Sequence, residues 1–283
     1  MHAAALPPAV GFLPGGLLTD QGLARDYAFV PADGRLELAL GEIATARCSR
    51  PQAVSAALVA GLCHLAGGPA LPGRVDALCV ADRQFLMRQL ARHLGDDGGW
   101  FTATCGACGS RFDFELRFAD LPVRAAGDGY PWAQVHWRGR PLRLRVPNGA
   151  DQIRLLATPP DAAAGTDPQA AMLAMLLADD GPLTAADLPP LAAPERMQFE
   201  AALEAVSPGV CTEVAASCPD CASVSAVDID PYAVLARPLD GLLDEVHRLA
   251  SAYHWSEADI LSLPRARRQR YLQLIDRQRG LQA

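Results

Sequence analysis

The sequence contains no lysine, so all 25 of its basic residues are arginines. With the many alanines, glycines and prolines, this bias is typical of a GC-rich genome and carries little functional information. Long apolar runs are also missing, because no stretch reaches the roughly 18 apolar residues that span a bilayer. The first residues lack a basic region and are interrupted by Pro7, Pro8 and Pro14, which disfavours a signal peptide. We therefore expect a cytoplasmic protein without membrane contact.

Motifs of the common enzyme classes are absent as well. The chain has no Gly-x-Ser-x-Gly, no phosphate-binding loop and no Gly-x-Gly-x-x-Gly. Its carboxylates are scattered, and no pair stands out as a general acid and base. A formal net charge of -7 disfavours nucleic acid and anionic membranes as partners. These absences predict a globular protein that is not an enzyme and binds no small-molecule substrate.

Two Cys-x-x-Cys motifs, here called knuckles, are the most informative feature present. They are Cys105-Gly-Ala-Cys108 and Cys218-Pro-Asp-Cys221. Zn²⁺ prefers four thiolate or imidazole ligands in a tetrahedron, and one knuckle supplies two sulfurs about 3.5–4 Å apart. Four cysteines favour a closed structural site, because a catalytic zinc keeps one position for water. We therefore expect one structural Zn²⁺, although 110 positions (218 − 108) separate the knuckles.

Two alternatives to zinc remain open, namely a pair of metal-free knuckles and a redox disulfide. A thioredoxin-like motif should begin a helix in a βαβ unit, whereas both knuckles have strand-like flanks. The layout of residues 102–114 is repeated at 214–226, which suggests pseudo-twofold pairing of the knuckles. The remaining cysteines are expected to be buried small apolar residues. They are Cys48, Cys63, Cys79 and Cys211.

The hydrophobic pattern predicts an α+β fold, with short antiparallel strands around a zinc-ribbon-like site of four cysteines. Helical segments are expected in the N-terminal, middle and C-terminal parts of the chain. We divide the chain into an N-terminal α+β region (1–99), a zinc-knuckle core (100–237) and a helical tail (238–283). The core contains an inserted hairpin and helical segment at about 122–210.

In the first region, Tyr27 to Ala39 is expected to be extended, with a turn at Asp33-Gly34 and a strand-like alternation over residues 35–38. A helix should follow Ser49, with His64 near its end, and another should run from Asp82 to Gly95. In the middle we expect a hairpin (134–146), a loop (158–168), helices near 167–178 and 194–206, and a connector around 189–190.

The tail has apolar residues at helical spacing from Leu239 to Tyr253, a break at His254-Trp255 and a last helix from about Pro264. That last helix is rich in arginine. Either it has a solvated face or it is a docking surface for an acidic protein. Nucleic-acid binding is disfavoured, because Tyr271 is the lone aromatic residue there. The candidate partner-binding residues are Arg265, Arg267, Arg268, Arg270, Tyr271 and Trp255.

A family resemblance is carried by several segments together. They are Leu13-Pro-Gly-Gly16, Val80 to Leu86, the second knuckle with Val227-Asp-Ile-Asp230, and the tail from Leu243 to Leu272. These resemble the T-even-type phage baseplate hub assembly protein (chaperone) family of contractile tails and related contractile injection systems. The resemblance covers most of the chain except about 150–195. It implies a non-enzymatic role in building a baseplate hub, and only the knuckle cysteines carry over, as metal ligands.

We therefore expect an assembly chaperone or minor baseplate component whose partners are baseplate or tail proteins, in the bacterial cell or in a phage-like particle. A nucleic-acid-binding zinc ribbon is the first alternative. It is disfavoured by the acidic residues that flank the knuckles, which are Asp113, Glu115, Asp228 and Asp230. A thiol oxidoreductase is the second alternative, and it requires a reactive thiol of low pKa.

Overall fold

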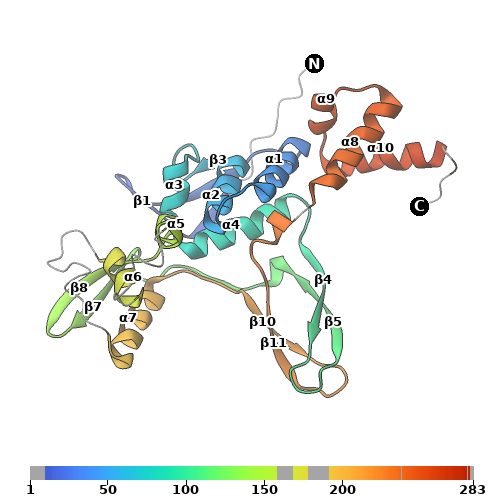
Figure 1. The fold of residues 1–283 in the computed structure, drawn as a ribbon. Helices are drawn as coiled ribbons and strands as arrows, with labels where there is room; N and C mark the ends of the chain where they lie inside the picture. Colours follow the sequence, from blue (N-terminus) through green and yellow to red (C-terminus); the bar gives the residue numbers. More distant parts are fainter. Residues whose placement is uncertain (1–9, 158–167, 178–190, 237, 279, 281–283) are drawn as a thin grey trace.

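The computed structural model describes residues 10–157, 168–177, 191–236, 238–278 and 280. It has the predicted α+β fold, with short antiparallel strand pairs and many helices. In Figure 1, two long hairpins project from a central body, which carries a smaller group of helices and strands on one side and a helical tail on the other.

The central body combines a three-stranded antiparallel sheet with a set of helices. Strand β2 (Gly22–Phe29) lies between β1 (Gly11–Thr19) and β3 (Leu62–Leu65). The helices are α1 (Gly34–Thr45), α2 (Arg50–Gly61), α3 (Pro72–Ala77) and α4 (Val80–His93). Their shared core is leucine-rich, and its fully buried members include Leu58, Leu65, Leu86 and Leu90.

The prediction that residues 35–38 are extended is wrong, because they lie in the first turns of α1. Asp33 caps this helix, since its carboxylate accepts hydrogen bonds from the amides of Arg35 and Leu36. Leu36 and Leu40 are both buried, and their spacing of four residues fits one face of a helix. A four-residue alternation is too short to separate a strand from a helix, so the capping aspartate decides between them.

The two other helices predicted here are confirmed. Helix α2 follows Ser49 directly, and the Ser49 amide donates to the Gln52 side chain at 2.9 Å. Helix α4 begins at Val80, two residues before Asp82, and Gly95 follows its end with a φ of +83°. His64, expected at the end of a helix, lies instead in strand β3 and pairs with Asp26.

Asp82, in the first turn of α4, connects this helix to the hairpin of β1 and β2. Its fully buried carboxylate accepts hydrogen bonds from the amides of Gly15 and Gly16, at 2.8 and 2.7 Å. Burial raises the pKa of Asp82 to about 6, although the two amides act in the opposite direction. The segment Leu13-Pro-Gly-Gly16 therefore presents two backbone donors to a buried acid, at a point where Gly16 has a φ of +107°.

A second hydrophobic cluster is built on the predicted hairpin, which is confirmed as β7 (Trp132–Trp137) and β8 (Arg140–Arg145). The predicted middle helices are also confirmed, as α6 (Pro168–Leu176) and α7 (Ala193–Val206). Helix α5 (Gly149–Ala157) precedes them. The predicted connector at 189–190, and all but the last residue of the predicted loop at 158–168, lie outside the described residues.

The chain enters and leaves this cluster through a short strand pair. Strand β6 (Val123–Arg124) pairs antiparallel with β9 (Gly209–Val210), so positions 124 and 209 are neighbours although 85 residues (209 − 124) separate them. The strands that flank the knuckles lie directly outside this pair. We call β6 and β9 the stem. In Figure 1 the two knuckle hairpins, β4–β5 and β10–β11, project from the same side of the body.

The tail consists of α8 (Leu239–Tyr253), α9 (Glu257–Leu261) and α10 (Arg265–Gln278). The predicted break is confirmed, because His254 adopts the left-handed conformation with a φ of +55°. Among the described helices, none is long and apolar enough to cross a bilayer.

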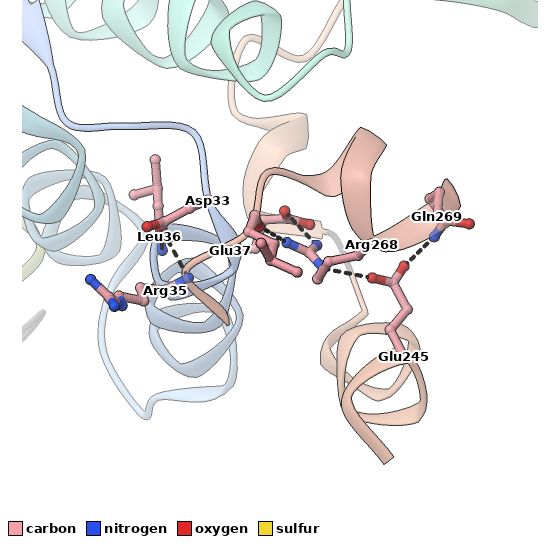
Figure 2. A network of polar contacts seen from close by, with 8 residues as sticks. Asp33, Arg35, Leu36, Glu37, Glu245, Arg268 and Gln269 are labelled. Carbon is pink, nitrogen blue, oxygen red and sulfur yellow. Dashed lines mark hydrogen bonds and ion pairs between the residues drawn. The ribbon is translucent and has the colours of Figure 1, made fainter. Parts of the chain in front are cut away.

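The tail is docked on the body through a buried arginine, as Figure 2 shows. Arg268 of α10 donates to the carboxylates of Glu37 on α1 and Glu245 on α8, at 2.7 and 2.9 Å. Its third contact is the carbonyl oxygen of Leu263, at 2.7 Å. Burial lowers the pKa of Arg268, but the two carboxylates outweigh this effect and raise it. One fully buried cation thus joins three elements.

Candidate metal centre

Each knuckle is the turn of its own hairpin. The first hairpin is β4 (Gly98–Thr104) with β5 (Arg111–Arg117), and the second is β10 (Glu213–Ser217) with β11 (Val224–Asp228). Both turns therefore have strands on either side, as predicted. Strand flanks distinguish these knuckles from thioredoxin-like motifs, in which the cysteines begin a helix.

The two knuckles have the same backbone hydrogen bonds. In the first, the Cys105 amide donates to the Ser110 carbonyl and the Gly109 amide donates to the Cys105 carbonyl, both at 2.9 Å. In the second, Cys218 bonds to Ser223 and Ala222 bonds to Cys218 in the same way, also at 2.9 Å. The repeat in the sequence is therefore a repeat of local geometry.

The two knuckles have different residue types at one position that requires a special backbone conformation. The residue after the second cysteine adopts the left-handed conformation in both, with a φ of +76° at Gly109 and +59° at Ala222. Glycine adopts this conformation without steric cost, whereas alanine pays roughly 1 kcal/mol for its Cβ. The second knuckle therefore contains backbone strain that the first avoids.

A small apolar core lies beneath the four sulfurs. Ala103 and Phe112 of the first hairpin and Ala216 of the second are buried there, and Phe114 and Val227 pack beside them. Both hairpins thus turn one apolar face toward each other. This packing brings the two knuckles together at the ends of the hairpins.

The four sulfurs of Cys105, Cys108, Cys218 and Cys221 lie within 4.8 Å of one another. The sulfur of Cys105 is 3.6 Å from that of Cys221, and that of Cys108 is 3.7 Å from that of Cys218. A tetrahedron with metal–sulfur bonds of about 2.3 Å has edges of about 3.8 Å. The cluster is therefore compatible with a metal site of four thiolates.

The electrostatics of the cluster also fit a cation. The amides of Cys108 and Ala107 donate to the sulfur of Cys105 and lower its pKa to about 6. For Cys218, the amide of Cys221 lowers the pKa, but burial and the sulfurs of Cys108 and Cys221 act in the opposite direction, and the pKa is raised to about 11. Four thiolates at these distances would repel one another, and a cation bound between them would offset that repulsion.

The other cysteines are not part of this cluster, and the prediction that all are buried is wrong. Cys79 is buried and caps α4, whereas Cys211 is half-buried. Cys48 and Cys63 are exposed. Cys63 lies in β3, where successive side chains point to opposite faces, so an apolar neighbourhood in sequence does not bury it.

The candidate partner-binding residues of the tail separate into two groups. Arg265, Arg267 and Arg270 are exposed, but Arg268 is fully buried, so its assignment to an exposed face is wrong. Trp255 and Tyr271 come together, with ring centroids 4.9 Å apart in an edge-to-face contact. They form a half-exposed cluster with Tyr253, whose ring stacks on Trp255.

Sequence reasoning missed the acidic partners of Arg268. Glu37 and Glu245 lie 231 and 23 positions away from it, and neither has a distinctive sequence context. One signal could have identified Arg268 itself. It shares a helical face with Leu272 and Ile275, four and seven residues further on, and both of these are buried.

Comparison of the chain with protein-family models, with curated proteins and with solved structures gave no match.

Proposed function

We propose that the four knuckle cysteines bind one structural Zn²⁺. The observation that carries this proposal is the distance between sulfurs of different hairpins, 3.6 and 3.7 Å, which fits the edges of a tetrahedron of four sulfurs around zinc. Four sulfur ligands leave no position for water or substrate, so the ion would hold the hairpins together and catalyse nothing.

Elemental analysis of the purified protein tests this proposal. About one zinc per chain is expected, and Cys218→Ser should lose most of it because the tetrahedron lacks a ligand. Cys63→Ser is the matched control, because Cys63 is exposed and lies outside the cluster. One iron per chain, or no metal in freshly purified protein, would overturn the assignment to zinc.

We further propose that the protein is a non-enzymatic assembly chaperone or minor component of a contractile-tail baseplate hub. Two features support this role. All four members of the cluster are cysteines, which suits a structural site in a scaffold, and the resemblance described above includes the second knuckle and the tail. Its partners would be baseplate or tail proteins of a phage or a phage-like injection system.

The two rival functions have less support. A thiol oxidoreductase needs a reactive thiol of low pKa, and the lowered pKa of Cys105 meets that requirement. Thioredoxin-like motifs, however, begin a helix, whereas each knuckle joins two strands. A nucleic-acid-binding ribbon needs a basic surface, yet Asp113 and Glu115 of β5 and Asp228 of β11 lie on the hairpins themselves.

Affinity purification of the tagged full-length chain from its native host tests the baseplate role. Sheath, tube or baseplate proteins should copurify. Separation of assembled particles from free protein then distinguishes a permanent subunit, which stays with the particle, from a chaperone, which does not. Copurification with nucleic acid alone, or with no tail protein, would contradict the proposal.

A further inference from the structure

Helix α10 has two opposite faces. The inner face, with Arg268, Leu272 and Ile275, is buried against the rest of the tail and the body. The outer face repeats every three or four residues, and all of its members are exposed. It consists of Arg267, Arg270, Leu274 and Arg277.

The charges of this outer face are not balanced within the described part of the chain. Arg268 on the inner face has two carboxylate partners. By contrast, the guanidinium groups of Arg270 and Arg277 bond only to Gln273, and that of Arg267 has no polar partner among the described residues. Arginines three residues apart on a helix repel each other. An acidic surface placed against this face would remove that repulsion.

Such a surface exists on the same chain, on helix α7. Its outer face follows the spacing i, i+3, i+4, i+7 and is exposed at every position. It consists of Met197, Glu200, Ala201 and Glu204. Neither of the two carboxylates has an ion-pair or hydrogen-bond partner among the described residues, and Met197 is 62% exposed. Figure 1 shows α7 and α10 on opposite sides of the molecule, so they cannot meet within one chain.

We propose that the outer face of α10 docks on the outer face of α7 in a second copy of this chain. The spacing of the two faces fits an antiparallel contact. Arg270 and Arg277 are about 10 Å apart along their helix, and Glu200 and Glu204 about 6 Å along theirs, at 1.5 Å per residue. Long arginine side chains bridge that difference. Leu274, between the two arginines, then meets Ala201, which lies between the two glutamates.

The contact joins two different faces, so each copy has one donor face and one acceptor face. Such head-to-tail contacts build closed rings or open chains of copies, not simple symmetric dimers. Two short helix faces bury less area than stable interfaces usually do. Association should therefore depend on protein concentration and weaken as salt screens the charges. This inference goes beyond the proposed function and does not depend on it.

Sedimentation velocity of the full-length protein tests the contact. At low salt the average mass should rise with concentration, and high salt should return it to that of one chain. Reversal of two charges, in Arg270→Glu with Arg277→Glu, should weaken association by on the order of tenfold or more. Glu200→Arg with Glu204→Arg should have the same effect from the other side of the contact.

The decisive sample is an equal mixture of these two double variants. Each alone should associate much more weakly than the parent protein, whereas the mixture should associate again, because contacts between the two variants pair opposite charges. Arg47→Glu with Arg140→Glu is the matched control. It changes the net charge equally at exposed arginines outside both faces and should associate like the parent protein.

The proposal is overturned if the parent protein remains a single chain at every concentration and salt level, or if the mixed variants fail to associate. It is also overturned if α10 is a nucleic-acid surface. In that case a short DNA or RNA oligonucleotide would bind the parent protein and the control but not Arg270→Glu with Arg277→Glu.

Discussion

Two long-range contacts hold this protein together, and they differ in how readily each can be predicted from the sequence. The four-cysteine cluster joins sulfurs that are 110 and 116 positions apart, and Arg268 joins Glu37 across 231 positions. The first can be read from the spacing of its residues. The second depends on one arginine among several, and the fold alone decides which arginine it is.

The two contacts also differ in chemistry. Four thiolates around a divalent ion would still carry a net charge of two minus, but the metal–sulfur bonds would add their binding free energy directly to folding. Arg268 is fully buried, and the side chains of its two acidic partners are only 14% exposed, so the attraction must offset a large loss of hydration. We therefore expect the cysteine cluster to make the larger net contribution to stability. The buried ion pairs of Arg268 should make a small net contribution, but replacing Arg268 should be costly because two buried carboxylates would lose their cation.

The largest expected effect is that of metal removal, which should destabilise the cysteine cluster and leave the contacts of Arg268 unchanged. If the proposed metal is bound, a chelator should increase hydrogen exchange in β4, β5, β10 and β11, because such a metal would contribute on the order of 10 kcal/mol to folding. The amides of α1, α8 and α10 should keep their protection. Equal loss of protection in hairpins and tail would show that the two contacts are not independent.

Arg268→Met should be next, with a loss of about 3–5 kcal/mol in the free energy of unfolding, because Glu37 and Glu245 stay buried without a cation. Urea denaturation measures this loss. Arg267→Met, on the exposed side of the same helix, should change stability by less than about 0.5 kcal/mol. Equal effects of both changes would place Arg268 outside the docking contact.

Gly34→Ala tests how closely the tail approaches α1. A Cβ added to Gly34 would lie 2.9 Å from a methyl carbon of Leu261. It would lie 3.0 Å from the Cα of Leu261 and 3.0 Å from a guanidinium nitrogen of Arg268. We expect a loss of about 1–2 kcal/mol in thermal or urea unfolding. Gly73→Ala in α3 is the control, because nothing lies within 4 Å of its added Cβ, and it should be neutral or slightly stabilising.

The smallest effects should come from the strained position of the knuckles, and their signs should be opposite. Gly109→Ala should destabilise the metal-bound protein by about 1 kcal/mol, because it forces a Cβ into the left-handed conformation. Ala222→Gly should relieve that strain and stabilise by up to about 1 kcal/mol. Melting temperatures of the two variants, compared at equal metal content, measure this; a shift of the same sign in both would refute the argument.

Much of the fold could be predicted from the sequence because its signals are local. The knuckles, their strands, hairpin β7–β8 and helices α2, α4, α7 and α8 all have spacing or capping signals that extend over many residues. The errors occurred where the signal was short. Residues 35–38 alternate over only four positions, and His64 lies in a strand of four residues.

The candidate site shows the same limit. The four cysteines are found together because a Cys-x-x-Cys turn carries its own geometry. Exposure of Cys48 and Cys63 could not be predicted, since it depends on which face of an element meets the core. Arg268 has the same composition around it as Arg267, and only the packing of α10 on α1 distinguishes them.

The stem formed by β6 and β9 has a consequence for how the protein can change over time. Its two short strands keep the ends of an intervening segment of more than eighty residues side by side, so length changes in the loops of that segment need not move the hairpins apart. Insertions or deletions in the surface loops of this module should leave the cysteine geometry intact. The hairpins can therefore stay constant while the module diverges to suit different neighbours.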